Sequence, residues 1–161
     1  MHPRTPIRLQ RFAETHRQVG AICNAANWLE YQLEIAVSEL SGTDDLTETQ
    51  GQRWRTLVER LKSLLKDGVV TDESAVTELR ELLSQINGAM SARDLVVHST
   101  WLITNSTKPG HVTGQRYRPR GEERRDWNPD QLEQVRKNLE AVTNALSSTA
   151  WNAVMPPDKW V

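Results

Sequence analysis

Residues 90–101 bring together side chains that can move a proton. The segment contains Arg93, Asp94 and His98. Asp94 and His98 are four residues apart, so on a helix they share one face and their side chains can pair. A carboxylate beside an imidazole orients the ring and fixes its tautomer, which prepares a histidine for general acid–base chemistry. We therefore treat Arg93, Asp94 and His98 as candidate catalytic residues.

The spacing of Arg93 and His98 limits how one helix can use them. Five residues apart, they differ by about 140° around an ideal helix, which would not aim both side chains at one atom. Either the long arginine side chain reaches around the helix, or a second copy of the helix completes the site. A structural alternative stays open, in which His98 caps the end of the helix and Arg93 and Asp94 make ordinary ion pairs.

Arg93 also interrupts the apolar stripe of the helix that carries it. This helix is predicted to begin near Thr71 or Asp72, and its stripe advances by alternating steps of three and four residues. The positions in the stripe are Val76, Leu79, Leu83, Ile86, Met90, Arg93 and Val97. An arginine where the pattern requires an apolar residue is a local inconsistency, and such inconsistencies often mark functional sites.

The order of residues 93–98, Arg-Asp-Leu-Val-Val-His, resembles the signature of the HEPN superfamily (higher eukaryotes and prokaryotes nucleotide-binding). That signature is an arginine, a polar residue, a few apolar residues and a histidine near the end of a long helix. The apolar run before it and the helix after the following insertion also match the family's order. The resemblance implies a bundle of four or five helices and, in many families, a metal-independent ribonuclease that acts as a homodimer. Other members are catalytically silent partners of nucleotidyltransferases.

The resemblance also implies a role for each motif residue. His98 would act as general base or acid on the ribose 2′-hydroxyl or the leaving oxygen, and Arg93 would hold the scissile phosphate and stabilise the transition state. Asp94 would orient His98. Because the hydroxyl of the RNA itself attacks, no metal or other cofactor is expected. One toxin branch has a tyrosine, modified by the antitoxin, two residues after the histidine. Thr100 stands there in this chain, which argues against that mode of control.

A basic, irregular segment follows the motif. Residues 101–127 lose the helical period and hold six Lys or Arg against three acids, although the whole chain has a formal net charge of -1. Arg116, Tyr117 and Arg118 set an aromatic ring between two guanidinium groups, which suits phosphate contact and base stacking. The candidate RNA-binding residues are Arg116, Tyr117, Arg118, Arg120 and Trp101. The structural alternative is a solvated loop with ordinary surface charge.

The apolar periodicity predicts an all-α fold, a four- to five-helix antiparallel bundle that forms one domain over residues 1–161. The helices expected besides that of Arg93 are 6–40, 49–66 and one that starts with Asn128 as its cap and stops at Pro156-Pro157. Residues 101–104 and 115–118 have the composition of two short strands. The segment before the last long helix is thus expected to be an irregular or β-hairpin insertion.

The totals narrow the class of protein. Cys23 is the single cysteine, so no intramolecular disulfide can form, and the four histidines lack metal-ligand spacing. No apolar run approaches the roughly 20 residues that span a bilayer, and we expect a cytoplasmic protein without membrane contact. The resemblance of residues 93–98 leads us to predict an HEPN-like, metal-independent endoribonuclease or RNA-binding protein of a defence or toxin system. RNA, a second copy of the chain, and an antitoxin or nucleotidyltransferase are its expected partners. The alternative is a non-catalytic helical adaptor or dimerisation module.

Overall fold

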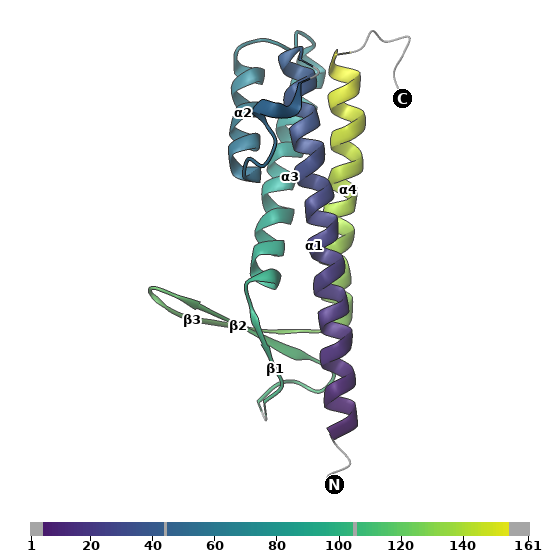
Figure 1. The fold of residues 1–161 in the computed structure, drawn as a ribbon, viewed down its shortest axis with the longest axis vertical. Helices are drawn as coiled ribbons and strands as arrows, with labels where there is room; N and C mark the ends of the chain where they lie inside the picture. The colour runs from purple at the N-terminus through teal and green to yellow at the C-terminus, as the bar shows by residue number, and fades with distance from the viewer. Residues whose placement is uncertain (1–4, 44, 105, 155–161) are drawn as a thin grey trace.

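Long helices and one small sheet make up the chain in a computed structural model, which describes residues 5–43, 45–104 and 106–154 (Figure 1). The helices are α1 (Thr5–Ser41), α2 (Trp54–Lys66), α3 (Glu73–Val97) and α4 (Pro129–Val154), with one short 3-10 turn, η1 (Leu46–Glu48). The strands are β1 (Thr100–Leu102), β2 (Val112–Arg118) and β3 (Gly121–Trp127). The prediction of a mainly helical fold is confirmed. The all-α description is wrong in one respect, because the insertion before α4 is a three-stranded antiparallel sheet.

The direction of the helices differs from a simple antiparallel bundle. α1, α2 and α4 run one way along the long axis, and α3 runs the other way (Figure 1). The Gln18 side-chain amide donates to the carbonyl of Pro129 at 3.3 Å, which places the start of α4 beside the N-terminal half of α1. The Thr149 hydroxyl donates to Glu78 at 3.3 Å, which places the end of α4 beside the start of α3. α4 is therefore antiparallel to α3 and parallel to α1.

The connection between α1 and α2 accounts for this arrangement. It runs back along α1, where the Gly51 N–H donates to the Glu34 carboxylate at 3.0 Å. α2 then begins at Trp54, so the predicted start at residue 49 is wrong. Gly51 has a φ of +73°, a left-handed conformation that interrupts a helical run. A connection whose described part holds no helix longer than η1 thus makes the return that a helix makes in an up-and-down bundle.

The ends of α3 and α4 follow from local capping. Asp72 accepts hydrogen bonds from the backbone N–H groups of Ser74 and Ala75, so α3 starts where the sequence predicts. Asn128 accepts from the N–H of Gln131, whose side chain accepts in turn from the N–H of Asn128. This reciprocal capping box confirms the predicted start of α4. The predicted stop at Pro156-Pro157 lies outside the described residues.

The sheet follows the end of α3 in the chain and touches α1 through β2. β2 pairs with β1 on one side and β3 on the other, with Trp101 opposite Gly114 and Arg116 opposite Glu123. Trp101 also packs edge-to-face on Trp127, with ring centroids 6.4 Å apart. The two predicted strands, residues 101–104 and 115–118, fall in β1 and β2 with shifted bounds. β3 escaped prediction because five of its seven residues are charged and it has no apolar alternation.

The helical stripes bury a common core between α1, α3 and α4. Its largest fully buried side chains on these helices are Ile22, Leu29, Leu33, Leu83, Ile86, Met90, Leu132, Leu139 and Leu146. α2 closes the core with Trp54, Leu57 and Leu61. Among the described residues, no helix combines the length and apolar character that crossing a membrane requires. Val96, which lies between Arg93 and His98 near the end of α3, belongs to this core.

Candidate functional site

The motif residues lie where α3 turns into the sheet. His98 is the C-terminal cap of α3, and its backbone N–H donates to the carbonyl of Asp94 at 3.2 Å. Its φ of -94° and ψ of 14° end the helix, and β1 follows two residues later. The His98 side chain is exposed, whereas those of Arg93 and Asp94 are partly buried. The helix end therefore presents His98 to solvent directly beside two less exposed charged groups.

Arg93, Asp94 and His98 line one pocket of about 540 Å³. Glu30 of α1 and residues 51–56, which include the first turn of α2, complete its wall. The angle of about 140° on an ideal helix does not separate Arg93 from His98 here, because the helix ends between them. A single chain thus places both residues on one cavity, without the second copy that the spacing had suggested.

Asp94 is the carboxylate in this pocket that pairs with two arginines. Its Oδ1 accepts from Nη1 of Arg93 at 3.0 Å, and its Oδ2 accepts from Nη2 of Arg55 at 3.2 Å. The Asp94 side chain is only 15% exposed and that of Arg93 only 19%, so the bond between them is less screened than a surface pair, whereas Arg55 is exposed. The His98 ring makes no hydrogen bond with any described residue. The expected bond from Asp94 to His98 is therefore replaced by ion pairs of the kind that the structural alternative predicted.

Arg93 has an unsatisfied donor. Its side chain is 19% exposed, and one guanidinium nitrogen is used by Asp94. Its Nε–H is buried and has no acceptor within the described part of the chain. Buried polar groups normally find a partner, so an unpaired donor on a side chain that lines a pocket calls for a water or an anion as its acceptor. Arg93 can thus bind an anionic group while Asp94 holds the guanidinium in place.

Three further residues of the pocket were not predicted from the sequence. Burial raises the pKa of the Glu30 carboxyl, and the charge of nearby Arg93 partly opposes this rise. Arg55 brings a second guanidinium, which also stacks over the Trp54 ring at 4.5 Å. Gln52 contributes a buried side-chain oxygen without a partner among the described residues. Of these three residues, only Glu30 could have been suspected from the sequence, because its carboxylate directly follows the apolar Leu29, which is buried.

The basic insertion forms the arm made by β2 and β3. Figure 1 shows this hairpin projecting from the bundle on the side where α2 lies. Arg116 is half-buried, and Arg118 and Arg120 are exposed near the turn, where Arg118 pairs with Glu123 at 3.1 Å. Tyr117 is 73% exposed, but alternation along the strand turns it to the face opposite Arg116 and Arg118. The ring and the two guanidinium groups therefore do not form the single platform that the sequence suggested.

Trp101 is partly buried, as Arg116 is. It packs against Trp127 and the core. A Cβ atom added to Gly114, the residue opposite it, would lie 3.3 Å from its ring. Trp101 thus packs the sheet under the motif instead of offering a free face for stacking.

No protein-family model, curated protein or solved structure matches this chain. The likeness to the HEPN superfamily accordingly rests on residues 93–98 and on the order of the helices.

Proposed function

We propose that the chain is an HEPN-like, metal-independent endoribonuclease whose active site is the pocket of Arg93 and His98. The observation that carries the proposal is that one pocket is lined by both Arg93 and His98, and that each has a side-chain group without a partner among the described residues. The buried Nε–H of Arg93 lacks an acceptor among the described residues, and the His98 side chain is exposed in the same pocket. A phosphate needs the first group and proton transfer needs the second.

The chemistry follows from these roles. His98 removes the proton of the ribose 2′-hydroxyl, and the freed oxygen attacks the adjacent phosphorus. A new oxygen–phosphorus bond forms, the bond to the 5′-oxygen of the next nucleotide breaks, and that oxygen takes up a proton from water, while His98 returns its proton to the solvent. Arg93 binds the negative charge that grows on the phosphoryl oxygens in the transition state. Asp94 acts as a positioning residue, since it fixes the guanidinium groups of Arg93 and Arg55.

The exposure of His98 separates this proposal from the adaptor alternative. Catalysis requires the ring to face free space, whereas an adaptor can bury it, and the exposed position favours catalysis. A different observation favours the adaptor. Trp28 of α1 is 55% exposed and forms an edge-to-face pair with Tyr31, with centroids 5.8 Å apart. Exposed aromatic pairs of this kind are frequent at protein interfaces, so a non-catalytic dimerisation or adaptor module is the second candidate.

The biological setting and partners are proposed on the resemblance. A homodimer, RNA as substrate, and an antitoxin or nucleotidyltransferase partner fit a defence or toxin protein. The exposed Trp28 and Tyr31 give the homodimer a candidate surface. The cytoplasm, where RNA is available, is the compartment that this function requires.

The direct test is cleavage of mixed RNA by purified protein in the presence of EDTA. A positioned general acid or base is typically worth about 10²- to 10⁴-fold in rate, so His98→Ala should slow cleavage by about that factor. Arg93→Ala should act similarly, and Arg93→Lys should rescue poorly because lysine lacks the planar fork. His16→Ala is the matched control, since His16 is an exposed histidine of α1 outside the pocket. Equal behaviour of wild type and His98→Ala, whether active or inert, would leave the adaptor as the better explanation.

A further inference from the structure

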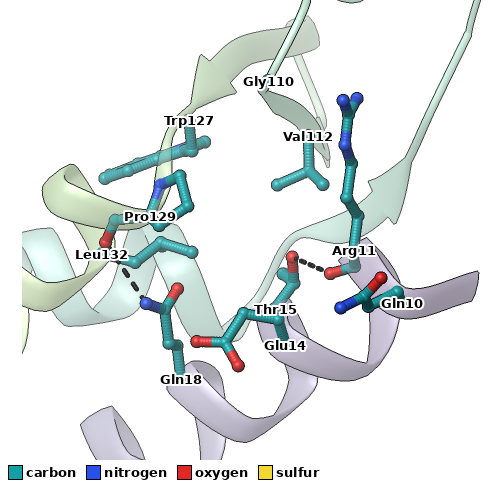
Figure 2. A pocket seen from close by; sticks show the side chains of 10 residues that line it. All are labelled: Gln10, Arg11, Glu14, Thr15, Gln18, Gly110, Val112, Trp127, Pro129 and Leu132. Atoms are coloured by element: carbon teal, nitrogen blue, oxygen red, sulfur yellow. Dashed lines mark hydrogen bonds between the residues drawn. The ribbon is translucent and has the colours of Figure 1, made fainter. Parts of the chain in front are cut away.

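A second pocket, of about 260 Å³, lies where the N-terminal half of α1 meets the sheet and the first turn of α4 (Figure 2). One wall is apolar and is formed by Val112, Trp127, Pro129 and Leu132. The other wall is polar and comes from α1, with Gln10, Arg11, Glu14, Thr15 and Gln18. It shares no residue with the pocket of Arg93 and His98. Its role is thus independent of the proposed ribonuclease.

Gln18 leaves an acceptor open in this pocket. The residue is 8% exposed, and its Nε2 donates to the carbonyl of Pro129 at 3.3 Å. That bond fixes the orientation of the amide, because a flipped amide would set its oxygen against the carbonyl oxygen. Oε1 is buried without a hydrogen-bond partner among the described residues, and Figure 2 shows it turned toward the interior of the pocket. A ligand in this pocket would therefore satisfy Oε1 of Gln18 only if it carries an N–H or O–H donor.

Two of the neighbouring polar groups of α1, on Glu14 and Thr15, are already engaged. Glu14 accepts two hydrogen bonds from Arg17, at 2.7 and 3.0 Å, and the Thr15 hydroxyl donates to the carbonyl of Arg11 at 2.8 Å. The Arg11 guanidinium is different, since it makes no hydrogen bond or ion pair with any described residue. It extends beside Val112, away from Gln18 (Figure 2). One wall of the pocket thus presents an open acceptor and, apart from it, an open cation.

We infer that this pocket binds a small aromatic acid that carries an N–H donor. The donor would reach Oε1 of Gln18, the ring would lie among Trp127, Val112 and Leu132, and the acid group would meet Arg11. Pockets for drug-sized ligands occupy about 300–1,000 Å³, so a cavity of this size suits a single substituted ring. An apolar ring alone would leave the Gln18 oxygen unsatisfied, which is why the N–H is the decisive part of the ligand.

The test compares three probes of nearly equal size on the full chain by isothermal titration calorimetry. Para-aminobenzoate has both groups, para-methylbenzoate lacks the N–H, and para-toluidine lacks the acid. Wild type should bind para-aminobenzoate about five- to tenfold more tightly than para-methylbenzoate, the effect expected for one hydrogen bond to a buried acceptor. The signals of Val112 and of the Trp127 indole should shift in the NMR spectrum. Absence of binding by wild type, or equal binding of para-aminobenzoate and para-methylbenzoate, overturns the inference.

Variants assign the contacts. Gln18→Met keeps the length of the side chain without the acceptor and should abolish the preference for para-aminobenzoate over para-methylbenzoate. Arg11→Gln should weaken para-aminobenzoate severalfold and leave para-toluidine unchanged, while Arg8→Gln, an exposed arginine one turn earlier, should bind like wild type. A folded Gln18→Met protein that retains the preference counts against the inference. Should this variant fail to fold, the probe comparison on wild type still decides.

Discussion

Arg55 reaches from the first turn of α2 to Asp94 on α3, where its Nη2 donates to Oδ2 across 3.2 Å. Asp94 holds Arg93 through its other oxygen at 3.0 Å. One carboxylate therefore fixes two guanidinium groups and ties α2 to the end of α3 beside His98. This arrangement makes Asp94 a residue that both stabilises the fold and positions the proposed catalytic arginine.

We expect Asp94→Asn to lower the free energy of unfolding by about 1–3 kcal/mol, because it leaves the partly buried guanidinium of Arg93 without its counter-charge. Urea unfolding followed by circular dichroism measures this change. The control is Glu59→Gln, which removes an exposed pair with Lys62 at 2.7 Å and should cost less than about 1 kcal/mol. RNA cleavage by Asp94→Asn should fall less than in His98→Ala, since no reacting group is lost. An unchanged unfolding midpoint would show that the ion pairs of Asp94 contribute nothing to the stability of the fold.

Glu30 should make stability depend on pH in a defined direction. Burial raises the pKa of its carboxyl in the folded chain, so the folded state binds the proton more tightly than the unfolded state does. Its ionisation therefore destabilises the fold as pH rises from the ordinary glutamate pKa through the raised value. Relative to wild type, Glu30→Gln should gain stability from about pH 4 to pH 7. Thermal unfolding at several pH values measures this trend.

Glu14 provides a control of opposite sign. The hydrogen bond from Arg17 lowers the pKa of its carboxyl, so its contribution is present at neutral pH and is lost as pH falls through the lowered value. Glu14→Gln should therefore lose stability relative to wild type as pH rises over the same range. Parallel curves for the two variants would contradict the assignment of Glu30 to a desolvated site.

The hairpin should contribute charge to RNA binding. Replacing Arg116, Arg118 and Arg120 together with Gln should reduce the slope of log affinity against log salt by about two, since each phosphate contact on a single strand contributes roughly 0.7. Binding of a labelled single-stranded RNA at several salt concentrations measures this slope. The control replaces Lys62, Lys66 and Arg80, exposed cations of α2 and α3, with Gln. An unchanged slope in the hairpin variant would mean that the arm is only a solvated surface.

The proposed homodimer can be tested apart from the site. Sedimentation at high micromolar concentration should show self-association, and Trp28→Ala should weaken it, because an exposed tryptophan supplies much apolar contact area. Exclusive monomer in wild type would refute the homodimer. It would leave the catalytic proposal standing, since one chain places Arg93 and His98 on the same pocket.

Local sequence determined the helices and their ends. The starts of α3 and α4 were predictable because Asp72 and Asn128 bind backbone groups only two or three residues away. The motif was visible for a similar reason, since Arg93 interrupts an apolar stripe and His98 follows within two turns. The late start of α2 shows the limit of periodicity, because the apolar pattern gave no sign of the left-handed turn at Gly51.

Tertiary structure decided the directions of the helices and the composition of the pockets. The first pocket combines Glu30, Arg55 and Asp94 from three different helices. In the second pocket, Gln18 contacts Pro129 across more than a hundred residues of sequence. No spacing along the chain predicts these contacts. β3 formed despite its charges because β2 offered it a full backbone ladder with Arg116 opposite Glu123. Sequence patterns record which residues favour burial or a helix end over a few turns. The meeting of distant polar groups depends on how the whole core packs, and the chain order does not encode it locally.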